Sequence, residues 1–437
     1  MNLKVLKFGG TSLCDAEHFR KVASIIKSDP SRRYIVVSAP GKRFAGDNKV
    51  TDLLYRCYSI ALEDGDITEV FEEVKERYNS IISDLGIDID LAEYFEKIKA
   101  SLLHSSGRDY VASRGEYLNA MIFAKYMGYP FIDAKKIIFF NEDGTFNAEK
   151  TNDIVREYLA RYENAVIPGF YGSMPNGTIK TFTRGGSDIT GSILARALSA
   201  SLYENWTDVS GALMADPRIV EDPCPISLVT YKELREMSYM GATVLHEEAI
   251  FPVRCSKIPI NIRNTNRPED RGTYIVPTTD EPCPHVITGI AGKTGFSTIT
   301  IEKDMMNSDL GFARKTLQVI EDNKIPFEHF PSGIDTMTVI VSTKALEKSR
   351  ADVLAGICKN VNPDNIFVED NLALIAVVGR GMVKAKGTAS RVFTSLANAN
   401  INIRMIDQGS SELSIIVGID ANDYVEAIKA IYAEFIK

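Results

Sequence analysis

The chain has 437 residues, of which 45% are hydrophobic and 25% are charged, and its formal net charge is −8. This length exceeds one ordinary core, so we expect roughly two to four domains in a soluble globular protein. The negative charge argues against nonspecific binding to nucleic acid, which needs a positive field, but it still allows a local basic site for a small anion.

The spacing of the cysteines and the length of the apolar runs indicate the cellular compartment in which the protein is expected. None of the six cysteines forms a CxxC pair, and no cysteine–histidine cluster has the spacing of a zinc site. This pattern favours free thiols in a reducing cytoplasm. The first residues, MNLKVLKFGG, do not resemble a signal peptide, and no apolar run approaches the ~18 residues of a membrane helix. We therefore expect a cytoplasmic protein that does not enter a membrane.

The first elements predict an α/β domain. The apolar run VLKF (5–8) precedes two glycines, and a helix is expected from about Asp15, whose carboxylate can cap it. A second buried strand, YIVVSA (34–39), follows this helix. The order strand, glycine turn, helix and strand is typical of a parallel sheet.

Further helices and strands alternate along the chain. Helical periodicity fills about 51–83 and 92–127, a hairpin-like turn is expected over 174–182, and another helix is expected from Ile189 to Ala200. The proline-rich stretch at 277–284 is the best candidate for a linker.

Beyond this linker the sequence repeats with an offset of 76 residues. Residues 311–341 align without a gap on residues 387–417, with six identical positions. Each copy contains a strand, a glycine-led helix, an extended segment, a glycine turn, a strand and a further helix, which predicts two βαββα units of ferredoxin-like type. Two such modules behind an α/β domain indicate a regulatory tail, and a merely structural tail is the alternative.

Familiar nucleotide motifs do not fit. The segment AGKTG (291–295) resembles the end of a P-loop, but position 287 is isoleucine where that motif needs glycine. The segment GRG (379–381) lacks the third glycine of a dinucleotide fingerprint, and no protein-kinase HRD or DFG set is present. If the protein handles a nucleotide, it uses another arrangement.

The sequence KFGG places Lys7 on the first strand, with Gly9 and Gly10 directly after it, at the sheet edge where open α/β folds bind ligands. Glycines let backbone N–H groups approach a phosphate, and a lysine supplies a compact charge for phosphate oxygens. The alternative is a solvent-facing lysine beside an ordinary turn.

The segment TRGGSD (183–188) combines several binding groups. Arg184 can grip a carboxylate, Ser187 can donate a hydrogen bond, and Asp188 can hold a cation or orient a lysine. Gly185 and Gly186 expose backbone N–H groups. The alternative is a turn in which Asp188 only caps the next helix.

Two further motifs carry polar residues that could bind ligands. Glu116, in SRGE (113–116), lies near an expected helix start, where it can stabilise the helix end or pair with a substrate ammonium. Thr207 and Asp208 follow a short apolar segment, and Arg218 follows a proline. Each motif alone is ordinary, but their order along one chain is not.

These motifs resemble the aspartokinases of the amino acid kinase superfamily over the full length of the chain. KFGGTS, VVSAP, Thr51, RGE, TRGGSD, TDVSG…DPR and GATVLH stand in family order, and the duplicated tail is similar to paired ACT domains. The resemblance implies a three-layer α/β/α sandwich with a mainly parallel sheet over 1–283. Two ferredoxin-like (βαββαβ) ACT domains follow at 284–368 and 369–437, and whether the C-terminal end completes the first stays open.

The resemblance implies transfer of the γ-phosphoryl group of ATP, with Mg²⁺, to the β-carboxylate of L-aspartate, the first step toward lysine, threonine and methionine. A carboxylate nucleophile with a pKa near ~4 is already ionised, so no general base is required. Lys7 and Asp188 are then the expected catalytic residues, with no protein ligand directly on the metal. The alternatives are another small-molecule kinase and a non-catalytic amino-acid sensor with a decayed kinase domain.

The other contacts follow from motif match. The phosphate contacts are Lys7, Gly9, Gly10 and Ser38; the aspartate contacts are Thr51, Glu116, Arg184, Gly185 and Ser187; the nucleotide contacts are Thr207, Asp208, Leu213, Arg218 and Thr243. Two of them depart from the family pattern, because Thr243 stands where many relatives have lysine and Leu213 where they often have an aromatic residue. We expect either weaker nucleotide binding or compensation by a nearby cation such as Arg218.

ACT pairs in this family bind an end-product amino acid at a dimer interface, which implies a homodimer or a dimer of dimers. The segments MMNSDLGF and IPFEHFPSGID are similar to the lysine-responsive type and place Met305, Ser308, Phe327 and Glu328 at the effector site. Glu328 can take a lysine ammonium, or it is simply an exposed acidic strand residue. Lysine is the expected effector, with threonine as the alternative.

Overall fold

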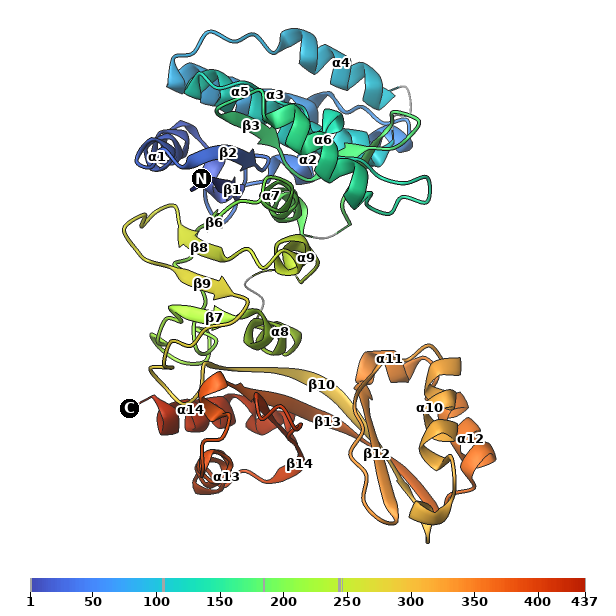
Figure 1. Cartoon of the computed structure of the whole chain (residues 1–437). Coiled ribbons are helices and arrows are strands. Elements are labelled where there is room, and N and C mark those ends of the chain that lie inside the picture. Colours follow the sequence, from blue (N-terminus) through green and yellow to red (C-terminus); the bar gives the residue numbers. More distant parts are fainter. Residues whose placement is uncertain (1, 104–106, 184, 243–244, 246, 437) are drawn as a thin grey trace. The chain divides into compact units, whose positions relative to one another are not determined.

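The computed structural model describes residues 2–103, 107–183, 185–242, 245 and 247–436. The chain divides into two compact units, which are described one at a time (Figure 1). Unit 1 comprises Met1–Ala212, Pro225–Tyr231 and Val244–Thr279, and unit 2 comprises Leu213–Cys224, Lys232–Thr243 and Asp280–Lys437. Within the described residues, no helix is both long and apolar enough to cross a membrane.

Unit 1 is built on a seven-stranded sheet in the order β3-β2-β1-β6-β8-β9-β7. Neighbouring strands are parallel except for the antiparallel pair β8 and β9. The strands are β1 (Lys4–Phe8), β2 (Arg32–Val37), β3 (Ala165–Pro168), β6 (Leu202–Thr207), β7 (Leu228–Thr230), β8 (Ile260–Asn264) and β9 (Thr273–Val276). A separate hairpin is formed by β4 (Tyr171–Ser173) and β5 (Ile179–Thr181).

Helices cover both faces of this sheet (Figure 1). One layer contains α1 (Ala16–Lys27), α2 (Val50–Leu62), α3 (Thr68–Leu85), α4 (Ala92–Leu103) and α5 (Arg108–Met127). The other contains α6 (Ala148–Leu159), α7 (Gly186–Ala197) and α9 (Glu247–Cys255). Short 3₁₀ turns occupy η1 (Thr11–Leu13) and η2 (Ala134–Lys136). The predicted three-layer α/β/α fold is confirmed.

The alternation of side chains along β1 explains how this fold positions a polar residue. Leu6 and Phe8 are fully buried and join the hydrophobic core with α1 to α5. Because successive side chains of a strand point to opposite faces, Lys7 between them points toward α7. The helix expected from about Asp15 is also confirmed, since Asp15 is the N-cap of α1 and accepts a hydrogen bond from the N–H of His18.

Unit 2 contains a six-stranded antiparallel sheet in the order β11-β12-β10-β13-β15-β14. The two central strands, β10 (Gly289–Glu302) and β13 (Asn365–Val378), are each 14 residues long. The others are β11 (Phe327–His329), β12 (Thr336–Ser342), β14 (Ile403–Asp407) and β15 (Ser414–Asp420). Unit 2 also contains most of the helix α8 (Tyr231–Tyr239). Its other helices are α10 (Phe312–Asp322), α11 (Thr343–Glu347), α12 (Arg350–Val361), α13 (Thr388–Asn398) and α14 (Tyr424–Phe435). Short 3₁₀ turns occupy η3 (Met306–Ser308), η4 (Arg380–Met382) and η5 (Ala421–Asp423).

The repeat seen in the sequence corresponds to two modules that share β10 and β13. The start of β13 lies 76 residues after the start of β10 (365 − 289 = 76), which is the offset of the repeat. The second half of β10 pairs with β12, while its first half, from Gly289 to Lys293, pairs with the end of β13 beside β15. The start of β10 therefore supplies the last strand of the second module.

This arrangement shows whether the C-terminal end of the chain completes the first module. The described chain ends after the helix α14, and no strand from that end joins the first module in the described residues. The boundary predicted at 368/369 falls inside β13, so the two modules are not separated there. Residues 213–224 and most of α8 also belong to unit 2, although they precede the predicted linker.

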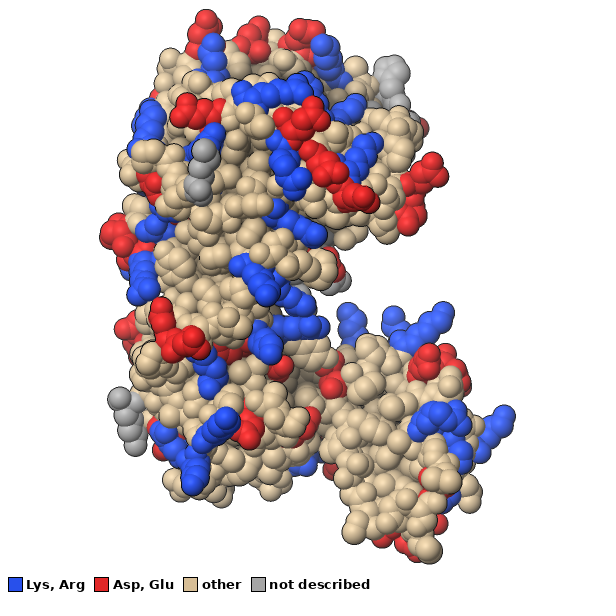
Figure 2. Space-filling model, in the orientation of Figure 1, with Lys and Arg blue, Asp and Glu red and all other residues tan. Residues whose placement is uncertain are grey.

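Charged side chains of both signs are interspersed on the face drawn in Figure 2. The net charge of −8 is therefore not the result of a single acidic surface on this face.

Candidate functional site

A buried lysine and a carboxylate meet where β1 approaches the first turn of α7. The ammonium of Lys7 lies 2.7 Å from Oδ1 of Asp188, and the Lys7 side chain is only 10% exposed. The same oxygen accepts a hydrogen bond from Nδ2 of Asn205 at 2.9 Å. Asn205 is opposite Lys7 in the parallel register of β1 and β6. Two predicted catalytic residues, far apart in the sequence, are thus joined, and a third side chain orients the carboxylate.

The start of α7 explains why the Asp188 carboxylate is available to Lys7. The N-cap is Gly185, with φ of 76°, and Gly186 has φ of 46°, a backbone conformation that favours glycine. A Cβ on Gly185 would lie 2.8 Å from Cβ of Ala249. The alternative that Asp188 only caps this helix is therefore wrong, as is the predicted helix start at Ile189. Arg184 lies outside the described residues.

The two glycines after β1 serve backbone packing. The N–H of Gly9 donates to the carbonyl of Trp206 at 3.0 Å, which differs from the prediction that it faces a phosphate. A Cβ on Gly10 would lie 2.8 Å from the carbonyl oxygen of Ala39, and the Gly10 carbonyl accepts from the N–H of Gly41 at 2.8 Å. Gly10 therefore brings the loop after β2 against the end of β1.

Glu116 is a buried carboxylate with one oxygen, Oε2, that has no partner in the described part of the chain. Burial raises the pKa of Glu116 to about 8, and the backbone N–H of Ala39, which donates to the carboxylate, offsets only part of that rise. Glu116 is in the interior of α5, so the alternative of a residue at the helix end is wrong. A cation placed beside this carboxyl would favour its ionised form.

Oγ of Ser187 and Oδ1 of Asn119 are also among the buried polar atoms that have no hydrogen-bond partner within the described residues. Asn119 lies one helical turn beyond Glu116, and its Nδ2 donates to the carbonyl of Ser38 at 2.7 Å. Ser187 packs closely on Gly169 after β3, where a Cβ would lie 2.3 Å from that of Ser187. Buried polar groups are nearly always hydrogen-bonded in native proteins, so these atoms mark places where a ligand can supply the missing partner.

The remaining predicted residues of unit 1 lie at the ends of other elements. Ser38 follows β2, and its N–H donates to the carbonyl of Phe8 at 3.2 Å, which places it beside the end of β1. Thr51 is half-buried in the first turn of α2, which packs on α5. Thr207 is the last residue of β6 and Asp208 follows it, at the same sheet edge as Lys7, and the Thr207 hydroxyl donates to Asp208 at 3.2 Å.

Two other predicted nucleotide contacts belong to unit 2. Leu213 and Arg218 are in unit 2, and the Arg218 side chain is exposed and paired with Asp216 at 2.5 Å. Thr243 lies outside the described residues. A single nucleotide site made of all five residues therefore stays a prediction.

The predicted effector residues lie on two segments of the first module in unit 2. Met305 and Ser308 belong to the turn between β10 and α10, and Phe327 and Glu328 belong to the edge strand β11. The side chains of Met305 and Phe327 are exposed. Glu328 accepts a hydrogen bond from the hydroxyl of Tyr239 on α8, so it is more than an exposed acidic strand residue.

Sequence reasoning missed Asn205 and Asn119. A signal for Asn205 was present, because it is a polar residue inside the buried strand YENWT and that strand precedes the Thr207–Asp208 motif. A signal for Asn119 was its spacing of three from Glu116, which puts both side chains on one face of a helix.

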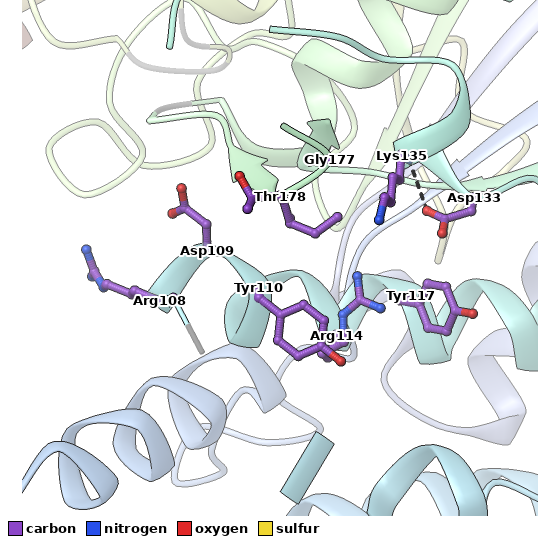
Figure 3. Close-up of a pocket in the computed structure, with 11 residues that line it drawn as sticks. Arg108, Asp109, Tyr110, Arg114, Tyr117, Asp133, Lys135, Gly177 and Thr178 are labelled. Carbon is purple, nitrogen blue, oxygen red and sulfur yellow. Dashed lines mark hydrogen bonds between the residues drawn. The ribbon is translucent and has the colours of Figure 1, made fainter. Parts of the chain in front are cut away.

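A separate pocket of about 730 Å³ lies on another face of α5 (Figure 3). It is lined by Gly107, Arg108, Asp109, Tyr110, Arg114, Tyr117, Asp133, Lys135, Gly177, Thr178 and Ile179. None of the site residues predicted from the sequence is among them.

Comparison with known proteins identifies the family. The amino acid kinase family model matches residues 2–264, and an ACT domain model matches residues 375–435. Aspartokinase 3 of Bacillus subtilis is 40% identical over 450 residues, which cover 99% of this chain and 98% of that protein. The crystal structure of Clostridium acetobutylicum aspartate kinase has 51% identity and a TM-score of 0.90 over 100% of both chains. Escherichia coli aspartokinase III in complex with aspartate and ADP shares the fold at 24% identity and a TM-score of 0.77, over 100% of both chains. The chain therefore belongs to the amino acid kinase family and, within it, to the aspartokinases.

Proposed function

We propose that this aspartokinase transfers the γ-phosphoryl group of ATP to the β-carboxylate of L-aspartate, giving 4-phospho-L-aspartate, the first step toward lysine, threonine and methionine. The observation that carries the proposal is the Lys7–Asp188 pair at the ligand-binding edge of the sheet. The likeness to Bacillus aspartokinase 3 and to the Clostridium aspartate kinase supports it over nearly the full chain.

The chemistry requires charge neutralisation rather than a base. The β-carboxylate of aspartate is ionised at neutral pH, so the barrier lies in bringing one anion to another. Lys7 supplies a fixed cation for the moving phosphoryl group, and Asp188, which is oriented by Asn205, holds its ammonium in place. Mg²⁺ carried with ATP would supply further positive charge, and the second oxygen of Asp188 would be able to accept a hydrogen bond from a water molecule bound to that ion.

The substrate is oriented by groups that lack partners among the described residues. Aspartate brings an ammonium and two carboxylates, and Oε2 of Glu116 is a suitable acceptor for the ammonium. The hydroxyl of Ser187 can donate to a carboxylate from the first turn of α7. We assign Arg184 and Gly185 to the α-carboxylate and Thr51 to the substrate by motif match.

The decisive experiment traps the acyl phosphate with hydroxylamine, first with aspartate and then without it. Product is expected only with aspartate, and Lys7→Met is expected to lower kcat by roughly 10³-fold or more, because it removes the cation at the phosphoryl group. Lys21→Met removes the same charge from the surface of α1 and is the matched control. Product without aspartate, or an unchanged kcat in Lys7→Met, would contradict the proposal.

We further propose that the ACT pair holds the chain in a homodimer or dimer of dimers in the cytoplasm and binds lysine as an inhibitor near Glu328. The ammonium of lysine would compete with the Tyr239 hydroxyl for this carboxylate. Equal activity with and without millimolar lysine would exclude this effector, and inhibition by threonine alone would assign the site to threonine instead.

A further inference from the structure

Arg114 is a buried cation that has no acidic partner among the described residues. It is 8% exposed, and its described hydrogen bonds go to the hydroxyl of the adjacent Ser113, at 3.1 and 2.9 Å. No carboxylate forms an ion pair with it among the described residues. Buried charges are normally paired, because a guanidinium removed from water loses its hydration. A buried arginine without an acid is therefore expected to face a ligand or another source of negative potential.

Three tyrosine rings surround the Arg114 guanidinium and supply part of that negative potential. The guanidinium carbon lies 4.4 Å from the ring centre of Tyr117, 4.6 Å from that of Tyr110 and 5.5 Å from that of Tyr171. Cation–π contacts of this kind hold the guanidinium in one place and leave its N–H groups able to donate in the ring-free directions. The cage thus orients the arginine without neutralising it.

The guanidinium borders the 730 Å³ pocket, and Figure 3 shows Lys135 directed toward it from the facing wall. Lys135 is exposed and has no ion pair with a described carboxylate. The first turn of α5, at the mouth of the pocket, adds backbone N–H groups, since its N-cap Gly107 has no side chain to cap them. The volume is that of a small-molecule site.

The two acids of the pocket already have other partners. Asp133 accepts from the Tyr171 hydroxyl at 2.7 Å and from the backbone N–H of Lys135 at 3.0 Å. Asp109 accepts from the Thr181 hydroxyl at 2.7 Å and lies 3.6 Å from the ammonium of Lys180. The positive groups are thus left facing the pocket, whereas the negative groups are engaged in its walls.

We propose that this pocket is a second ligand site, separate from the Lys7 site, that binds the oxyanion group of a small metabolite, either a carboxylate or a phosphate. Arg114 grips the oxyanion with its planar fork, and Lys135 adds a second charge from the mouth. The tyrosine edges contact the rest of the ligand. This site does not depend on which reaction occurs at Lys7.

Isothermal titration of the full chain with two probes, citrate and inorganic phosphate, tests the proposal and tells the two oxyanions apart. Saturable binding of at least one probe is expected. Arg114→Gln should weaken it by roughly tenfold or more, because a charge-assisted bidentate contact is lost. Lys135→Gln, at the exposed mouth, should weaken it by roughly two- to fivefold. Arg161→Gln, which removes an exposed arginine paired with Glu157, should bind as the unmodified protein does.

A further variant distinguishes this pocket from the Lys7 site, which can also attract anions. Lys7→Gln should retain the binding. If Arg114→Gln does not fold, Lys135→Gln decides on its own, since its side chain is exposed. Three results would overturn the proposal: no saturable binding of either probe, binding that Lys135→Gln leaves unchanged, or binding lost in Lys7→Gln and kept in the pocket variants.

Discussion

The two faces of α5 make opposite use of a buried charge. Glu116 on one face is an acid with an unpartnered oxygen, and Arg114 on another is a base without an acid, both judged within the described residues. They are two positions apart on the helix, which separates their directions by about 200°. Neither can therefore neutralise the other at contact distance.

On the assignments proposed above, these two buried charges are arranged for ligands rather than for stability. An acid and a base four positions apart would pair along one face of the helix. The chain instead leaves both buried and apart, which costs stability, as functional sites commonly do. The acid face suits an ammonium, and the base face suits an oxyanion.

The largest expected effect concerns the acid face. Glu116→Gln should raise the KM for aspartate by roughly 100-fold, because a charge-assisted contact to the ammonium is lost, with a smaller change in kcat. Steady-state kinetics with each substrate varied in turn measure it. Glu93→Gln, an exposed residue of α4 paired with Lys97, is the control. A rise confined to the KM for ATP would break the assignment of this face to aspartate.

The next effect is a pH dependence of aspartate binding. With a pKa of about 8, Glu116 is mostly protonated at pH 7 in the free protein and must release its proton to pair with the ammonium. Affinity should therefore rise about tenfold from pH 7 to pH 9, with release of about 0.9 proton per aspartate at pH 7. Calorimetry in buffers of different ionisation enthalpy measures the release. Proton uptake, or equal release in Glu116→Gln, would contradict it.

A smaller effect is expected on stability without substrate. The pKa of Glu116 is raised from 4.5 to about 8 on folding, so the folded chain keeps a proton that the unfolded chain loses. The unmodified protein should lose about 1 kcal/mol of unfolding free energy relative to Glu116→Gln between pH 6 and pH 7, and the loss should level off above pH 8. Urea unfolding at each pH measures the difference. A gain with rising pH would reverse the sign and refute the raised pKa.

The smallest expected effect is the coupling between the two buried charges on α5, which tests directly whether its two faces are independent. A double-mutant cycle with Arg114→Gln and Glu116→Gln should give a coupling free energy below ~0.5 kcal/mol in unfolding experiments, because the two side chains leave α5 in opposite directions. Coupling well above 1 kcal/mol would mean that the two charges stabilise each other across the helix. The view of two independent faces would then fail.

Several of these features could be read from the sequence. The pairing of Lys7 with Asp188 could be anticipated, because a strand-end lysine and a carboxylate in a glycine-rich segment carry opposite charges. Their catalytic role stays a prediction. The repeat, with its offset of 76 residues, correctly predicted that the tail contains two similar modules. The hydrogen bond from the N–H of Gly9 to the carbonyl of Trp206 was not predicted, because only the strand order brings these two residues together.

Other features depend on contacts that no local pattern encodes. That Arg114 has no acidic partner among the described residues could not be predicted, because it depends on where the acids lie in the fold. Asp133, for example, accepts a hydrogen bond from Tyr171, which is 38 residues away in the sequence. The placement of α8 in unit 2 rests on contacts such as those of Tyr239 with β11. The sequence also did not predict that the modules share strand halves. A 14-residue strand has the same residue pattern whether it pairs within one module or within two.

The sharing of β10 and β13 has a consequence for the mechanics of the tail. Each strand is one continuous backbone that serves the first module with one half and the second with the other. Neither module can be cut away without opening a sheet edge in its neighbour. We therefore expect the tail to melt in a single cooperative transition, and any strain that a bound effector creates in one module to pass to the other along covalent bonds.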